Sequence, residues 1–96
     1  ETAKLTNLGR LKTEEPVNLE LPLKAGDKIN GHIVAGHIDG TGRLARRYKK
    51  GSDYVIEIDA PRNITKYIIY KGSVAIDGVS LTIVKPSGNR FTVHLI

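Results

Sequence analysis

The feature that most constrains the fold is a series of short runs rich in Val, Ile, Thr and Tyr, each ended by a turn signal such as Asn30-Gly31, Asp39-Gly40 or Asp77-Gly78. Short runs separated at this spacing are typical of an all-β barrel or sandwich. The pattern predicts strands over residues 4–7, 17–21, 32–38, 43–49, 54–59, 73–76, 80–85 and 90–95.

One segment, "APRNITKYIIY", departs from this pattern. Pro61 suits the first turn of a helix, and Ile64 and Ile68 are four residues apart, as on one helical face. We expect a short helix from Pro61 to about Ile68, ended by Gly72. No internal repeat or linker is present, so residues 1–96 are predicted to form one domain, all-β with one short helix.

Composition limits the environment and the class of protein. The 96 residues are 40% hydrophobic and 26% charged, which is ordinary for a globular chain. Cys is absent, so disulfides and thiolate metal sites are excluded and a cytoplasmic location is expected. No apolar run is long enough to span a membrane, and no membrane partner is expected. Because the chain starts at Glu1 and contains no Met, we expect a processed, excised or engineered piece.

The net charge of +5 raises the question of nucleic acid. Basic residues cluster in "RLARRYKKG", residues 43–51, with Tyr48 among them. A solvated strand end with its hairpin turn explains this cluster as well as a nucleic-acid footprint does. The chain has one Phe and four Tyr and no aromatic pair suited to base stacking, so no nucleic-acid partner is expected.

Two histidines, His32 and His37, lie in "NGHIVAGHIDGTG", which also holds four glycines. Side chains five apart in a strand point to opposite faces, so the two rings cannot share one metal without a bulge between them. The helical zinc signature with four-residue spacing is missing, and no metal site is predicted. The glycines indicate either a barrel corner or close passage of a flat ligand beside Gly36.

In "IDGVSLTIV" the aliphatic residues alternate with hydroxyl residues. Val79, Leu81 and Ile83 are expected on the core face, and Ser80 and Thr82 side by side on the other, about 7 Å apart. That second face is either a solvent-facing row or a shallow polar site that reads a heterocycle. A serine-hydrolase reading fails because no G-x-S-x-G elbow exists, and a phosphate-binding glycine loop lacks its strand–helix context.

The stretches "GHIVAGHIDGTG", "KYIIYKGSVAIDGVSLTIV" and "RFTVHLI" together resemble the second barrel of riboflavin synthase and its relative, lumazine protein. The likeness covers residues 30–96 and implies a six-stranded antiparallel β-barrel with a short helix. Residues 1–20 resemble the closing segment of a family barrel. The chain is therefore expected to be an excised tail of one barrel joined to most of the next, a permuted barrel, or a fragment whose first strands swap into a neighbour.

The resemblance also implies a function. Two molecules of 6,7-dimethyl-8-ribityllumazine react to give riboflavin and a pyrimidinedione, with no metal or organic cofactor. Substrates lie between two unlike barrels, so a single barrel is expected to be inactive or weakly active alone. The alternative is a non-catalytic lumazine- or flavin-binding module. A homo-oligomer is expected, because the ligand face is partly apolar when its partner barrel is missing.

The resemblance further implies the site residues. His37 is the acid–base or orienting candidate, and Ser80 and Thr82 would hydrogen-bond the pteridine or nucleophile, whereas His32 on the opposite face would be structural. In the family the first barrel has Cys where Ser80 stands. The expected substrate contacts are Gly36, His37, Ile38, Lys71, Ser80, Leu81, Thr82, Leu95, Ile96, Glu1 and Thr2.

Overall fold

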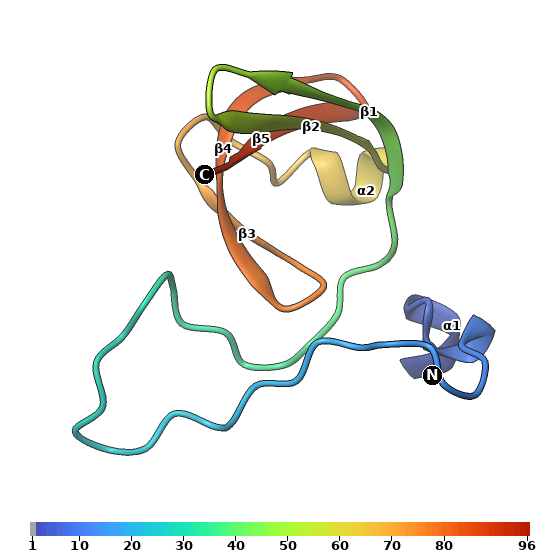
Figure 1. Ribbon diagram of the computed structural model, residues 1–96. Coiled ribbons are helices and arrows are strands. Elements are labelled where there is room, and N and C mark those ends of the chain that lie inside the picture. Colours follow the sequence, from blue (N-terminus) through green and yellow to red (C-terminus); the bar gives the residue numbers. More distant parts are fainter. Residues whose placement is uncertain (1) are drawn as a thin grey trace.

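The computed structural model describes residues 2–96, with side chains from Lys4 onward. Five strands form one antiparallel sheet in the order β1-β2-β5-β4-β3 (Figure 1). Their bounds are β1 Arg43–Lys50, β2 Asp53–Asp59, β3 Ser73–Ile76, β4 Val79–Ser87 and β5 Arg90–Leu95. The five strands predicted from residue 43 onward are confirmed, each within three residues of its observed ends.

Tight turns join β1 to β2, β3 to β4 and β4 to β5 where the sequence places Gly with a small polar neighbour. Between β3 and β4, Asp77 and Gly78 both have positive φ, 49° and 82°. Two positive φ values give a turn whose twist matches that of the flanking strands, and Asp-Gly is a preferred pair for it. The turn fixes the pairing of Ala75 with Ser80 and of Ser73 with Thr82.

The main core cluster lies on one face of the curved sheet, while Val55, at 1% exposure, is buried on the other face. Ile83, Phe91 and Val93 are the buried centre, at 1%, 4% and 0% exposure. Half-buried residues pack around them: Ile56, Ile58, Ala60, Ile68, Val74, Ile76 and Leu81. Burying a side chain of this size contributes about 1.5–3 kcal/mol, so these three residues anchor the fold.

The expected helix is present but shorter than predicted. α2 spans Arg62–Thr65 and follows Pro61, whose ring suits a helix start. Its one buried residue is Thr65, and Ile68 beyond it still reaches the core. The chain then turns through Lys71. The Lys71 N–H donates to the Ile83 carbonyl at 2.9 Å, so the β3–β4 ladder already begins before the first residue of β3.

The first 42 residues run outside the sheet (Figure 1). α1 (Thr2–Leu5) and a 3₁₀ turn η1 (Leu8–Arg10) begin the chain, and an extended arm without strand pairing follows. The predictions of strands over residues 4–7, 17–21 and 32–38 are wrong for this structure. A strand needs a partner as well as alternation, and no described segment pairs with these three.

The sheet is therefore open. β1 and β3 are its two edges, and the five strands do not close on each other. The mostly β class with a short helix is confirmed, while the six-stranded barrel implied by the resemblance is not seen among residues 2–96.

Candidate functional site

The outward face of β4 carries the hydroxyl residues singled out in the sequence. Ile83 is buried and Leu81 half-buried, whereas Ser80 and Thr82 are exposed. The predicted faces are confirmed for Leu81 and Ile83, because alternation along a strand fixes them once the core residues are known. Val79, also expected on the core face, is 44% exposed at the start of β4, beyond the edge of the core. Ser73 on β3 pairs with Thr82 and is exposed on the same face, so a third hydroxyl joins the row.

His32 contacts this row directly. His32 Nδ1 and Ser80 Oγ lie 2.6 Å apart in a hydrogen bond that joins the arm to β4. The expectation that His32 faces away from Ser80 assumed a strand over residues 32–38, and that segment is not a strand here. The ring that the structure brings to the hydroxyl row is thus His32, which sequence reasoning had placed outside the site.

Gly31 makes the contact possible. Its φ is +84°, and a Cβ at this position would lie 2.6 Å from both Cβ and Oγ of Ser80. Only glycine allows the backbone to pass this close to β4 in this conformation. The glycine that directly precedes His32 was a visible signal for a close backbone approach. The residue that it approaches, Ser80, is 49 positions later and could not be identified from spacing alone.

The other predicted residues of the arm lie apart from β4. Gly36 (φ +99°), His37 and Ile38 are exposed, and nothing lies within 4 Å of a Cβ built on Gly36. Within residues 2–96 the His37 ring has no hydrogen-bond partner, whereas Asn18 Nδ2 donates to the Asp77 carbonyl at 2.6 Å. The arm is therefore attached near the β3–β4 turn and at Ser80, on either side of its outermost loop.

The remaining predicted contacts divide between sheet and terminus. Lys71 is exposed, has a positive φ of 63°, and its Nζ lies 5.4 Å from the Tyr70 ring centroid. Leu95 is half-buried at the end of β5, and Ile96 is fully exposed. Glu1 lies outside the described residues, as does the side chain of Thr2, so their predicted place beside Ile96 stays a prediction.

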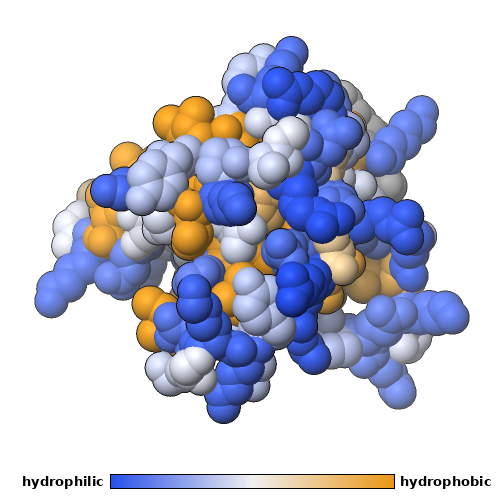
Figure 2. Space-filling view, turned by 90° about the horizontal axis from the view of Figure 1, so that it is seen from above, coloured by the Kyte–Doolittle hydropathy of each residue, from blue (hydrophilic) through white to orange (hydrophobic). Residues whose placement is uncertain are grey.

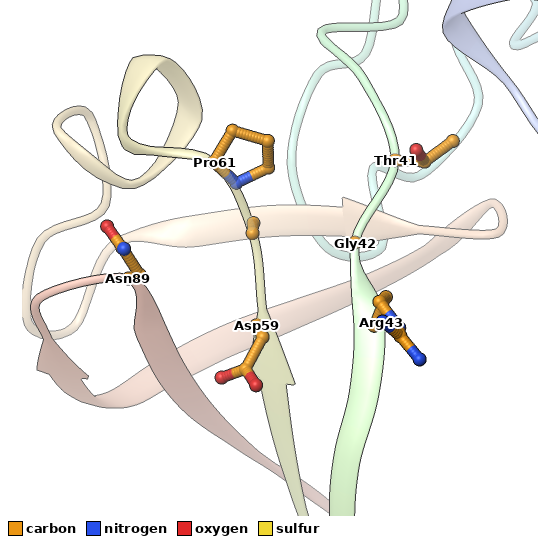
Figure 3. Close-up of a pocket in the computed structure, with 7 residues that line it drawn as sticks. Thr41, Gly42, Arg43, Asp59, Pro61 and Asn89 are labelled. Atoms are coloured by element: carbon orange, nitrogen blue, oxygen red, sulfur yellow. The ribbon is translucent and has the colours of Figure 1, made fainter.

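A separate shallow pocket of about 520 Å³ lies where β1 begins and β2 ends (Figure 3). Its lining residues are Thr41, Gly42, Arg43, Asp59, Ala60, Pro61 and Asn89. The Asp59 carboxylate accepts two hydrogen bonds from Arg90, at 2.6 and 3.0 Å, and this partner lowers the pKa of Asp59. Since its only carboxylate is already paired and no predicted site residue lines it, this pocket is not the candidate site.

Along residues 2–96, no group of three or more His, Asp or Glu side chains is placed to hold a metal ion. No described helix is long and apolar enough to cross a membrane.

A family model for the lumazine binding domain matches residues 35–96, which include all five strands and α2. The chain belongs to the lumazine-binding domain family. The match begins at residue 35, so Ser80 lies inside it, whereas Gly31 and His32 lie just before it.

Relatives of this lumazine-binding domain are proteins named riboflavin synthase. That of Actinobacillus pleuropneumoniae is 45% identical over 96 residues, which is 100% of this chain and 45% of the relative. That of Escherichia coli is 41% identical over 97 aligned positions, 100% of this chain and 46% of the relative. That of Mycobacterium tuberculosis (strain H37Rv) is 40% identical over 83 residues, covering 86% and 41%. The chain thus spans about half the length of the curated relatives it matches.

Proposed function

We propose that this chain is a riboflavin synthase barrel that binds 6,7-dimethyl-8-ribityllumazine or riboflavin on the outward face of β4. The observation that carries the proposal is the exposed hydroxyl row of Ser80 and Thr82, held beside His32 in a chain of the lumazine-binding family. Two hydroxyls and an imidazole offer both donors and acceptors to a flat heterocycle.

The residues take distinct roles in this proposal. Ser80 and Thr82 hydrogen-bond the pteridine, and His32 orients the Ser80 hydroxyl through its Nδ1 contact. His37 is exposed on the arm, four residues after Ile33. It remains the acid–base candidate for deprotonating the activated methyl group. The Lys71 backbone extends the ladder that includes Thr82, and this supports the proposal that the Lys71 side chain takes part in ligand binding.

The reaction joins two lumazines, one of which gives a four-carbon unit to the other. It requires two flat rings held in one orientation, which is worth about 7–11 kcal/mol of barrier for well-placed reactants. One hydroxyl row can position one ring. A single copy is therefore proposed to bind ligand with little or no turnover, and a non-catalytic lumazine- or flavin-binding module is the second candidate, favoured by the exposed, one-sided site.

The assembled protein is proposed to be a cytoplasmic homo-oligomer in which a sixth strand closes the sheet into a barrel. Support comes from the two unpaired edges, β1 and β3, and from the extended arm that leaves apolar residues in solvent.

Ligand binding is tested by titrating the full chain into riboflavin and, separately, into the lumazine, and following fluorescence. We expect saturable quenching, which Ser80→Ala with Thr82→Val weakens. Ser87→Ala, an exposed serine at the far end of β4, is the matched control and leaves the titration unchanged. No saturable change up to millimolar ligand rejects the proposed function.

A further inference from the structure

The free edge of β1 concentrates positive charge. β1 is a terminal strand of the sheet, so no described residue pairs with its outer edge. All eight of its residues are exposed. Five are cationic and none is acidic: Arg43, Arg46, Arg47, Lys49 and Lys50. Figure 2, which views the molecule from above, shows hydrophilic side chains spread over this side with hydrophobic patches between them.

An edge strand presents unpaired N–H and C=O groups that can take up another extended chain. The row of cations opposes pairing with a second, identical β1, because like charges opposite each other are destabilising. The same row favours an acidic strand. The edge therefore selects its partner by charge.

Such a strand exists in this chain. The segment of residues 13–23, here called the acidic arm, contains Glu14, Glu15 and Glu20 and no basic residue. Its apolar residues occupy alternate positions, the period of a strand: Val17, Leu19, Leu21 and Leu23. Leu19 and Leu21 are 91% and 87% exposed. The arm thus has a strand pattern, an apolar face without cover, and a charge opposite to that of β1.

The two prolines of the acidic arm limit how it can pair. Pro16 and Pro22 lack the N–H that a ladder requires, which leaves residues 17–21 as the pairing core. In the structure this core lies beneath β3 and leads away from β1 (Figure 1), and its Asn18 is bonded to the β3–β4 turn of the same copy. The acidic arm and the β1 edge of one copy therefore face different parts of solution.

We propose that β1 accepts residues 17–21 of a second copy as an added strand, reciprocally in the two copies. The register of β1 gives this pairing a defined orientation. When Leu19 and Leu21 lie on the side of Leu44, which pairs with core residue Ile58 and is 60% exposed, they also lie beside the aliphatic stems of Arg47 and Lys49, and Glu20 lies on the opposite side. That side carries Arg46, Tyr48 and Lys50, which pair with Glu57, Val55 and Asp53 of β2.

The chain has no Cys, so single cysteines report this pairing directly. Glu20→Cys in ¹⁵N-labelled chain is mixed with unlabelled chain carrying Arg46→Cys, Tyr48→Cys or Lys50→Cys, in a glutathione redox buffer. We expect the mixed disulfide, identified by mass, to exceed the statistical yield for at least one of the three. Lys66→Cys, an exposed lysine after α2, is the control and gives only the statistical yield. Yields equal to the control at all three positions overturn the proposal.

The same cysteines separate exchange from closure within one chain. A doubly substituted chain that forms its disulfide only as a monomer shows that the arm closes its own sheet, and this overturns the proposal. The proposal rests on the assembly part of the proposed function. Ligand takes no part in these measurements, so their failure leaves the proposed ligand binding untouched.

Sedimentation velocity supplies a second measurement. Leu19→Pro removes a ladder donor from the pairing core and should lower the association constant by at least about tenfold. Ile33→Pro is the matched control, since Ile33 is 80% exposed on the arm but outside the pairing core. Added salt should weaken association of the wild-type chain, because opposite charges attract it. A wild-type chain that stays monomeric, or a Leu19→Pro chain that associates like Ile33→Pro, overturns the proposal.

Discussion

At the scale of single residues, the contact between His32 and Ser80 depends on the absence of a side chain at Gly31. Gly31 and Gly36 both have positive φ, so alanine strains the backbone at either one. They differ in space: a Cβ at Gly31 meets Ser80 at 2.6 Å, whereas one at Gly36 meets nothing within 4 Å. Comparing the two substitutions therefore isolates the effect of the close approach.

We expect Gly31→Ala to separate His32 from Ser80 and Gly36→Ala to leave them together. The imidazole resonances of His32, followed by NMR in the free chain, should move in the first variant only. Ligand affinity should fall more for Gly31→Ala than for Gly36→Ala. Equal shifts of the His32 resonances in both variants would show that the close approach does not hold the contact.

The hydroxyl row gives a second prediction at this scale. Ser80→Ala and Thr82→Val should leave the free energy of unfolding nearly unchanged, because both side chains are exposed. Each should weaken ligand binding by about 0.5–1.5 kcal/mol, the usual net contribution of one hydrogen bond. Leu81→Ala, on the core side, should instead lower stability. Denaturant unfolding and titration of the three variants check this, and the reverse ranking in stability would mean that the faces of β4 are exchanged.

How far the site is predictable from sequence follows from these residues. The faces of β4 were predictable because alternation is local and one face is plainly aliphatic. The contact of His32 with Ser80 was not, because it depends on the path of an arm that has no regular structure. Lys71 was assigned to the site by its motif. Its left-handed backbone was not predictable, because lysine does not favour that conformation and Gly72 is the one turn-forming residue beside it.

At the scale of elements, one ion pair joins the end of β2 to the start of β5. Arg90 donates two hydrogen bonds to Asp59, and the two residues are also paired in the ladder. Hydrogen bonding and charge from Arg90 lower the pKa of Asp59 below its ordinary 3.8. A lowered carboxyl pKa adds stability above the unfolded value, and that stability is lost as pH falls through the folded value.

Asp59→Asn should therefore reduce the melting temperature near neutral pH, with the difference from wild type shrinking once pH falls below about 3.8. Since both side chains are solvent-exposed, the effect should be small and weaker in high salt. Thermal unfolding of both chains from pH 7 to pH 3 measures it. Asp53→Asn, at the other end of β2, is the control. A difference that stays constant over this range would contradict the assignment.

Elements were predictable where local pattern and pairing coincide. From Arg43 onward every predicted strand has a neighbour in the sheet, and turn residues mark its ends. The segment of residues 17–21 alternates as regularly as these strands do, but no strand among residues 2–96 pairs with it. Alternation of apolar and polar residues shows that a segment can form a strand, but it does not show which strand will pair with it.

At the scale of the whole molecule, activity should depend on assembly. A single copy is expected to convert the lumazine slowly or not at all, whereas two copies can bring two hydroxyl rows together. Single-turnover assays at several protein concentrations should show a rate that rises with concentration. His37→Ala should lower that rate if His37 is the acid–base group, and Ile33→Ala on the same arm serves as control. A rate independent of both concentration and His37→Ala would contradict the half-site proposal.

The sheet order also bears on how the chain folds. Three of its four strand pairs, β1–β2, β3–β4 and β4–β5, are hairpins between consecutive strands. Only β2–β5 joins distant parts of the chain, beginning with Asp59 and Arg90, 31 residues apart. Local pairs form early and distant ones carry the cost of closing a loop, so docking of β2 onto β5 should limit the folding rate. Substitutions at Ile56 or Val93, which pair across that junction, should slow folding, whereas changes in the outer hairpins should mainly speed unfolding.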